Sequence, residues 1–243
     1  MKMENKAQLA IFVIVAIVIV GVIGLFFVLR GRIDITPGIS PEIQPIYDYI
    51  HGCASSSLVN ASFIMGFQGG YIAMPEGYLK TNLSDFGYGI YKGKKVLVSR
   101  DDMEKVLESF IETTMDSCEV QQAFLDYDIE LKEPNAEVVI FDNNIELELD
   151  YDFVASKEDV SYSIDKPYLI EIETSLGKLQ GVAEQIVDKS LEDSENIDLD
   201  YLTDLDYEIL IIPYNETTFI YSITDYDYEL NEVNPVFVFA NSF

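Results

Sequence analysis

The chain has no tryptophan, one histidine and two cysteines, and only 15 of its 243 residues are lysine or arginine. A structural zinc site needs four ligands of the histidine or cysteine type, so these three side chains are too few to form one. Nucleic acids are bound through clustered lysine and arginine, whereas this chain carries 43 aspartate and glutamate residues and a net charge of −28. The composition therefore excludes structural zinc and a nucleic-acid partner.

The sequence also lacks the short patterns that mark common catalytic sites. It contains no P-loop, no Gly-x-Gly-x-x-Gly and no Gly-x-Ser-x-Gly pattern. Paired carboxylates could serve glycosidase chemistry, but no motif selects one pair among 43 acidic residues. We therefore expect no catalytic residue, no cofactor and no enzymatic activity.

One long apolar run dominates the N-terminal part of the chain. Residues 9–29 read LAIFVIVAIVIVGVIGLFFVL, with Lys6 before the run and Arg30 and Arg32 after it. As a helix this run reaches roughly 31 Å, the thickness of the hydrocarbon core of a bilayer. A cleavable secretory signal has a shorter apolar region followed by small residues. The run therefore predicts a retained transmembrane helix, with the lipid bilayer as its partner.

The start of the run carries a second signal. Lys6 and Ala7 come immediately before Gln8, which opens the apolar segment. This arrangement resembles the class III signal of archaeal, type IV pilin-like surface proteins, which a prepilin peptidase cuts after the small residue. The resemblance implies cleavage between Ala7 and Gln8. Many pilins have glutamate at the fifth mature position, where this chain has Phe12, and an ordinary signal anchor explains the same residues.

The remainder of the chain resembles uncharacterised archaeal single-pass membrane proteins. The resemblance rests on the two cysteines, the segment Gln68-Gly69-Gly70-Tyr71 and the segment Phe239-Ala240-Asn241. It implies no known activity.

The location of the domain follows from several weak signals taken together. The charges flanking the run are nearly balanced, so the positive-inside rule does not fix the orientation. Two cysteines and three glycosylation sequons, at Asn60, Asn82 and Asn215, suit an exterior location. The negative charge of the domain would also be repelled by anionic lipid headgroups. We expect a single-pass protein of the cell membrane with a cytoplasmic N-terminus and an extracellular C-terminal domain.

The chain is expected to have four parts. Residues 1–8 form a flank or leader, residues 9–29 the membrane helix, and residues 30–45 a stalk rich in proline and glycine. Closely spaced prolines prevent the membrane helix from continuing out of the bilayer. Residues 46–243 then form one acidic α+β domain, which is long enough to bury a full core.

Periodicity predicts the elements of this domain. Apolar residues recur at three- and four-residue steps from Ile46 to Met65, from Met103 to Cys118 and from about 175 to 191, which is typical of amphipathic helices. Ser99 is the expected N-cap of the second helix. Strict alternation from Ile145 to Phe153 predicts a strand with one buried face. Further strands are expected at 71–73, 88–98 as a hairpin, 137–141, 168–173, 207–213, 218–224 and 235–240, giving an antiparallel meander.

Cys53 and Cys118 both fall on the apolar faces of predicted helices. They are either joined as a disulfide or buried as separate thiols. An exterior location favours the disulfide, which would stabilise the fold by about 4 kcal/mol through its loop of about 65 residues. His51 lies two positions from Cys53 and points to a different face of the helix, so the two do not form a catalytic pair.

Two acidic stretches are the remaining candidates for binding. The denser one runs from Glu192 to Glu208, and Asp225 and Asp227 form a second. Carboxylates at two-residue steps suit calcium, but the EF-hand pattern fails because no glycine stands at its sixth position. Clusters of this kind arise by composition in so acidic a chain, so a solvated face is the simpler interpretation and we assign no metal ligand. The 16 tyrosines suit either a recognition surface or the edge of a core.

Together these features predict a membrane-anchored surface protein whose acidic domain binds or scaffolds and does not catalyse. A possible partner is another surface protein or a component of the cell envelope. One alternative is a type IV pilin-like filament or pseudopilin subunit processed after Ala7. A second alternative is an accessory subunit of a membrane complex.

Overall fold

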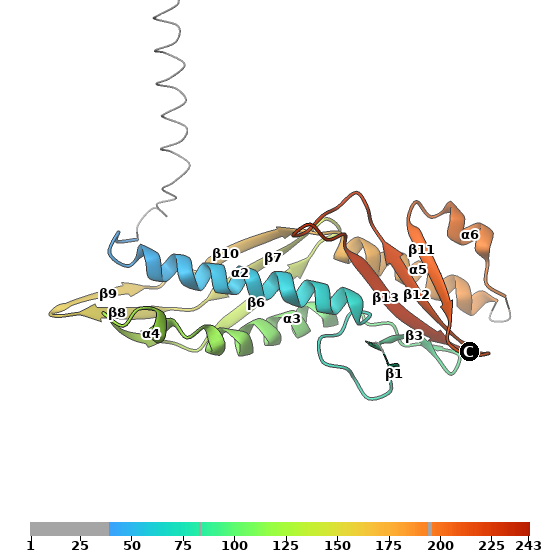
Figure 1. The fold of residues 1–243 in the computed structure, drawn as a ribbon, viewed down its shortest axis with the longest axis horizontal. Helices are drawn as coiled ribbons and strands as arrows, with labels where there is room; N and C mark the ends of the chain where they lie inside the picture. The colour runs from blue at the N-terminus through green and yellow to red at the C-terminus, as the bar shows by residue number, and fades with distance from the viewer. Residues whose placement is uncertain (1–38, 83, 194–195) are drawn as a thin grey trace, which may run out of the picture. The chain divides into compact units, whose positions relative to one another are not determined.

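The computed structural model describes residues 39–82, 84–193 and 196–243. The chain divides into two compact units, Met1–Pro45 and Ile46–Phe243, and the second holds nearly all of the described structure (Figure 1). The predicted membrane span at 9–29 lies outside the described residues, as do residues 1–8 and 30–38. Within the described ranges, no helix combines the length and the apolar character that crossing a bilayer requires.

The domain is α+β, as the sequence predicts, with helices packed on largely antiparallel sheets. The three predicted helices are present close to their expected bounds. The helices are α2 (Gln44–Phe67), α3 (Arg100–Met115), α4 (Val120–Ala123), α5 (Leu176–Glu192) and α6 (Leu199–Asp204), with a 3-10 turn η1 (Asp116–Cys118) after α3.

The largest sheet has five strands in the order β11-β12-β13-β3-β4. Its strands are β3 (Tyr88–Tyr91), β4 (Lys94–Lys95), β11 (Glu208–Pro213), β12 (Thr218–Thr224) and β13 (Val236–Ser242). The middle strand is β13, which agrees with its apolar residues on both faces, and its pairing with β3 is parallel. Helix α5 covers one face of this sheet, and Leu79 and Phe86 pack with Val238 on the other.

A second sheet has the order β10-β7-β6. Its strands are β6 (Asn135–Ile140), β7 (Asn144–Asp150) and β10 (Tyr168–Glu173). The predicted alternation is confirmed, because Ile145, Leu147 and Leu149 are buried while the glutamates between them are exposed. Between β7 and β10 the chain leaves the sheet and forms β8 (Phe153–Lys157) and β9 (Val160–Ile164), which pair with β5 (Asp128–Leu131). A short hairpin, β1 (Leu79–Lys80) with β2 (Asp85–Phe86), completes the strands.

Helix α2 runs along the domain beside α3 (Figure 1). Its residues Ile50, Ala54 and Leu58 have no exposed surface, which places one stripe of the helix in the core. The ring of Tyr47 stacks on Tyr168 of β10 with centroids 4.4 Å apart. Near the other end of the helix, a Cβ on Gly66 would come within 2.3 Å of the Val236 carbonyl oxygen, so only glycine allows this approach to β13.

Helix α3 begins as predicted and protects one edge of the second sheet. The Ser99 hydroxyl accepts a hydrogen bond from the Asp102 N–H, which makes Ser99 the N-cap. One face of the helix then presents Glu104, Glu108 and Glu112 toward β6. Their Oε1 atoms accept hydrogen bonds from the backbone N–H groups of Ile140, Val138 and Ala136 at 2.8, 3.1 and 3.1 Å.

The spacing of this glutamate ladder follows from the geometry of helices and strands. Four residues of a helix rise about 6.0 Å, and two residues of a strand rise about 6.7 Å. Glutamates at every fourth position of α3 therefore stay in step with every second residue of β6. The N–H groups they bind are those that point away from β7. The helix thus supplies the acceptors that a further strand would otherwise supply, and it closes an edge that would be open to another chain.

Some sequence predictions are wrong in detail. Residues 71–73 form no strand; the nearby strands are β1 and β2 instead. The predicted strand through Phe153 breaks after Asp150, because the chain turns into β8 there. The boundary between the two compact units, Pro45 and Ile46, coincides with the end of the predicted stalk, and before it residues 41–43 form a turn and α2 begins at Gln44. Proline is tolerated in a first helical turn, since its missing N–H would have no helical partner there.

Candidate functional site

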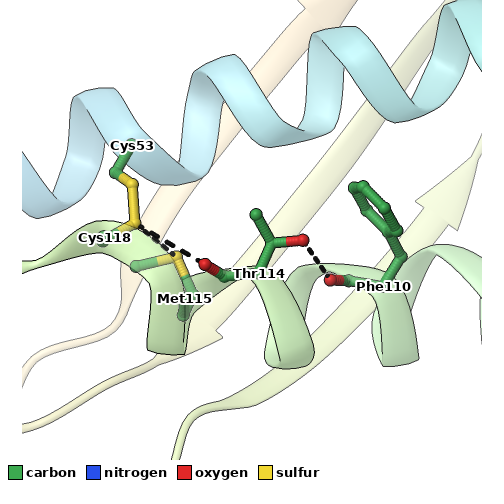
Figure 2. The surroundings of a disulfide bond; sticks show 5 residues. All are labelled: Cys53, Phe110, Thr114, Met115 and Cys118. Carbon is green, nitrogen blue, oxygen red and sulfur yellow. Dashed lines mark hydrogen bonds between the residues drawn. A yellow bond between two sulfur atoms is a disulfide. The ribbon is translucent and has the colours of Figure 1, made fainter.

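The predicted disulfide is present and joins α2 to η1 (Figure 2). The Cα atoms of Cys53 and Cys118 lie 6.3 Å apart, and the bond links residues 65 positions apart in the chain. Cys118 follows the last turn of α3 and is buried, with its sulfur 3.9 Å from the Met115 sulfur. The bond ties the core helix α2 to the turn that follows α3, which makes it a structural cross-link.

His51, close to the disulfide in sequence, does not form a catalytic site with it. His51 lies on α2 and is half-exposed. A disulfide-bonded sulfur cannot act as a thiolate nucleophile, so Cys53 does not form a catalytic pair with His51.

The predicted processing residues, Ala7 and Gln8, lie outside the described residues. The sequon asparagines Asn60, Asn82 and Asn215 are all exposed.

The two acidic stretches meet in space, which the sequence does not reveal. Strand β11 pairs with β12 so that Glu208 lies opposite Thr224. This register brings the end of the first stretch against the start of the second. Together they line an open depression, the acidic hollow, formed by residues 203–208 and 224–227. Its acidic members are Asp204, Asp206, Glu208, Asp225 and Asp227, and its aromatic members are Tyr207 and Tyr226.

The inner wall of the acidic hollow contains an ion pair between a buried aspartate and a partly exposed lysine. Asp225 is 3% exposed, and its Oδ2 lies 3.7 Å from the Lys178 Nζ of α5. The Asp225 Oδ1 accepts a hydrogen bond from the Asp227 N–H at 3.0 Å. The Lys178 ammonium also lies 5.1 Å from the centre of the Tyr207 ring. A hydrogen bond with Tyr207, with the nearby Asp225 adding to it, raises the pKa of Lys178, so the lysine is charged at neutral pH.

The outer wall of the acidic hollow is exposed and polar. The Tyr226 hydroxyl donates a hydrogen bond to the Glu208 carboxylate, and this bond raises the pKa of Tyr226. Both residues are exposed. The hollow therefore combines exposed carboxylates with phenol rings, which is suitable for contact with a positively charged group.

Metal coordination by these carboxylates finds no support in their positions. Among the described residues, no three histidine, cysteine, aspartate or glutamate side chains are arranged to hold a metal ion. In the first acidic stretch, Asp198 instead caps α6, where its side chain accepts a hydrogen bond from the Tyr201 N–H at 3.0 Å.

Comparison of the chain with protein-family models, with curated proteins and with solved structures found no match.

Proposed function

We propose that this chain is a membrane-anchored surface protein whose acidic domain binds a positively charged partner at the cell surface. The observation that carries the binding role is the acidic hollow, where the acidic residues before β11 and after β12 converge beside Tyr207 and Tyr226. The proposed partner is a basic segment of another surface or cell-envelope protein. Charge complementarity of this kind raises the rate of association and favours partners with positive charge over partners with negative charge.

The anchoring part of the proposal rests on the apolar run at 9–29 and on the disulfide. The run has the length of a membrane-spanning helix. Disulfides form and persist mainly in oxidising surroundings outside the cytosol, which supports an exterior position for the domain that contains the Cys53–Cys118 bond. In this proposal residues 9–29 stay in the bilayer and the domain is displayed outside.

The pilin-like alternative differs in how the membrane segment is used. A filament core packs N-terminal helices together without lipid, and it favours one continuous helix from the membrane into the head. Residues 41–43 form a turn immediately before α2, which supports the anchored arrangement over the filament subunit. Cleavage between Ala7 and Gln8 is compatible with both arrangements.

Binding of a lysine-rich peptide to the purified full chain tests the proposed role. Neutralising three carboxylates of the acidic hollow, in Asp206→Asn/Glu208→Gln/Asp227→Asn, is expected to weaken peptide binding roughly tenfold, because exposed charge pairs contribute about 0.2–1 kcal/mol each. The binding should also weaken as salt is added.

A matched control removes the same charge from another exposed surface. Glu137→Gln/Glu148→Gln/Glu171→Gln neutralises three glutamates on the outer face of the second sheet. This variant is expected to keep most of the affinity for the peptide. An equal loss in both variants would show that the peptide responds to net charge alone, and the acidic hollow would not be the binding site.

A further inference from the structure

Strand β11 is the outermost strand of the largest sheet and pairs only with β12 in the described structure. The next residue, Tyr214, continues this register, and its N–H donates a hydrogen bond to the Thr218 oxygen at 2.9 Å. Because bonded pairs alternate along an antiparallel ladder, the N–H groups of Ile209 and Ile211 point away from β12. Within the described ranges, no backbone oxygen accepts a hydrogen bond from either group.

Pro213 lies on the same free edge, since it follows Ile209 and Ile211 at two-residue steps. Proline has no N–H, and in sheets it is confined mainly to edge strands where the missing N–H would face solvent. Its position therefore agrees with an edge that faces solvent. This edge offers the N–H and carbonyl groups of Ile209 and Ile211, and the carbonyl group of Pro213.

The exposed side chains along this edge are apolar. Leu210 is 52% exposed and Ile212 is 51% exposed. They share one face of the strand, because alternate residues of a strand point to the same side. An edge strand with free backbone groups and exposed apolar side chains is a template for pairing with another chain.

Other sheet edges in the domain are protected. The glutamate ladder binds the edge of β6, and the Gln121 side-chain oxygen accepts a hydrogen bond from the Ile129 N–H of β5 at 2.8 Å. Strand β10 places Glu171 and Glu173 at exposed positions, and charged side chains discourage strand pairing. In β11, residues 209–212 are all leucine or isoleucine. The edge of β11 is therefore suited to strand pairing.

The acidic hollow lies at the beginning of β11. Glu208 is both the first residue of the strand and a member of the hollow, and Asp204 and Asp206 precede it. A strand added beside β11 would have one end next to these carboxylates. Charge complementarity favours lysine or arginine at that end, and apolar side chains farther along would contact Leu210 and Ile212.

A second copy of this chain fits the edge less well than a basic segment does. The net charge of −28 makes two copies repel each other. Residues 204–217, which contain β11 and its flanks, include no lysine or arginine. A copy paired through β11 would therefore bring no cation from this segment to the acidic hollow.

We propose that the partner's basic segment binds as an additional strand on the free edge of β11. The added strand runs antiparallel to β11, the slightly more stable arrangement, so its C-terminal end carries the lysine or arginine residues that contact the acidic hollow. Its backbone bonds Ile209 and Ile211, and its alternate apolar side chains contact Leu210 and Ile212. This inference rests on the proposed function for the charge of the partner, and it adds the conformation and the sequence pattern of the bound segment.

A peptide of alternating valine and threonine followed by three lysines tests the added strand against the full-length protein in detergent. Apolar valines should lie opposite Leu210 and Ile212, so the threonines lie opposite Ile209 and Ile211 and only their N–H groups point toward β11. N-methylation of the threonines should therefore weaken binding at least about tenfold, because it removes several hydrogen bonds. N-methylation of the valines should change the affinity little. Fluorescence anisotropy of labelled peptides measures both.

Two variants of the protein locate the strand. Ile211→Pro removes an N–H that points away from β12, and it should keep the fold and lower the peptide affinity about tenfold. Leu210→Ser/Ile212→Ser should lower the affinity in the same direction without changing the backbone. Val139→Ser/Leu169→Ser replaces exposed apolar residues of the second sheet. This control should bind the peptide as the natural chain does.

Equal binding of the two methylated peptides would overturn the added strand, as would unchanged binding by both Ile211→Pro and Leu210→Ser/Ile212→Ser. A peptide of lysine alone separates this failure from failure of the proposed function, because it still binds if the acidic hollow acts without the edge. Binding that survives replacement of the lysines by serine would overturn the basic class of partner. A dimer of the natural chain that Ile211→Pro converts to a monomer would assign the edge to a second copy and overturn the proposal.

Discussion

Glu108 of α3 accepts a hydrogen bond from the backbone N–H of Val138 on β6 at 3.1 Å. This bond is the middle one of the glutamate ladder, and Val138 itself is buried. A side chain of a helix thereby satisfies a backbone group at the edge of a sheet. Without it, the N–H would be left in a position with little access to water.

The glutamate ladder gives a first prediction. Glu108→Ala should lower the free energy of unfolding by about 1–3 kcal/mol, because it leaves the Val138 N–H without its acceptor. Glu108→Gln keeps an acceptor oxygen and should cost less. Ser109→Ala, at an exposed position on the same helix, is the control and should change stability by under about 0.5 kcal/mol. Urea unfolding of the full chain measures all three, and equal losses for alanine and glutamine would contradict a role as acceptor.

The disulfide gives a second prediction. Cys53→Ala/Cys118→Ala should lower the free energy of unfolding by about 4 kcal/mol, since the bond closes a loop of 65 residues. Reducing agent should destabilise the natural chain by a similar amount and leave the double variant unchanged. Before reduction, the intact mass should be lower than that of the dithiol by two hydrogens. A mass matching two free thiols in protein isolated from native membranes would contradict the bond.

The ion pair of Lys178 with the buried Asp225 gives a third prediction. Lys178→Met should cost about 2 kcal/mol, because it leaves the Asp225 carboxylate buried without its cation. Adding Asp225→Asn should recover much of that loss, since the amide oxygen can still accept the Asp227 N–H. The surface pair of Lys105 and Asp102 is the control, and Lys105→Met should cost under about 1 kcal/mol. Additive losses in Lys178→Met/Asp225→Asn would show that the pair is not coupled.

Buried tyrosine gives a fourth prediction, on pH. Tyr168 has no exposed surface, and burial raises its pKa well above the ordinary value of 10.0. Above pH 10 the unfolded chain loses a proton that the folded chain retains, so the stability present below pH 10 falls as the pH rises. The slope for one such group is at most about 1.4 kcal/mol per pH unit. Urea unfolding at a series of alkaline pH values should show a shallower decline in Tyr168→Phe, and an identical decline would contradict this assignment.

Much of the fold could be predicted because local patterns and tertiary packing agree. The Ser99 cap and apolar stripe define α3, and alternating residues define β7. The apolar helix faces predict that both cysteines are buried, and the expected exterior location favours the disulfide that the structure contains. In each case the spacing of the apolar residues along the sequence indicates which face of the element is buried.

The parts that could not be predicted depend on pairing between distant segments. The glutamates of α3 read as an ordinary polar face, and only the position of β6 shows that they bind its N–H groups. The acidic hollow forms because of the register of β11 on β12, which no local pattern specifies. The strand expected at residues 71–73 has β-forming residues but no neighbouring strand to pair with in the described structure.

The central claim is that an anchored domain is displayed outside the cell, and protease added to intact cells tests it most directly. The account predicts that peptides from residues 46–243 are released from intact cells, while a fragment containing residues 9–29 stays in the membrane after carbonate extraction. A domain that resists protease in intact cells and is cleaved only after lysis would contradict the account.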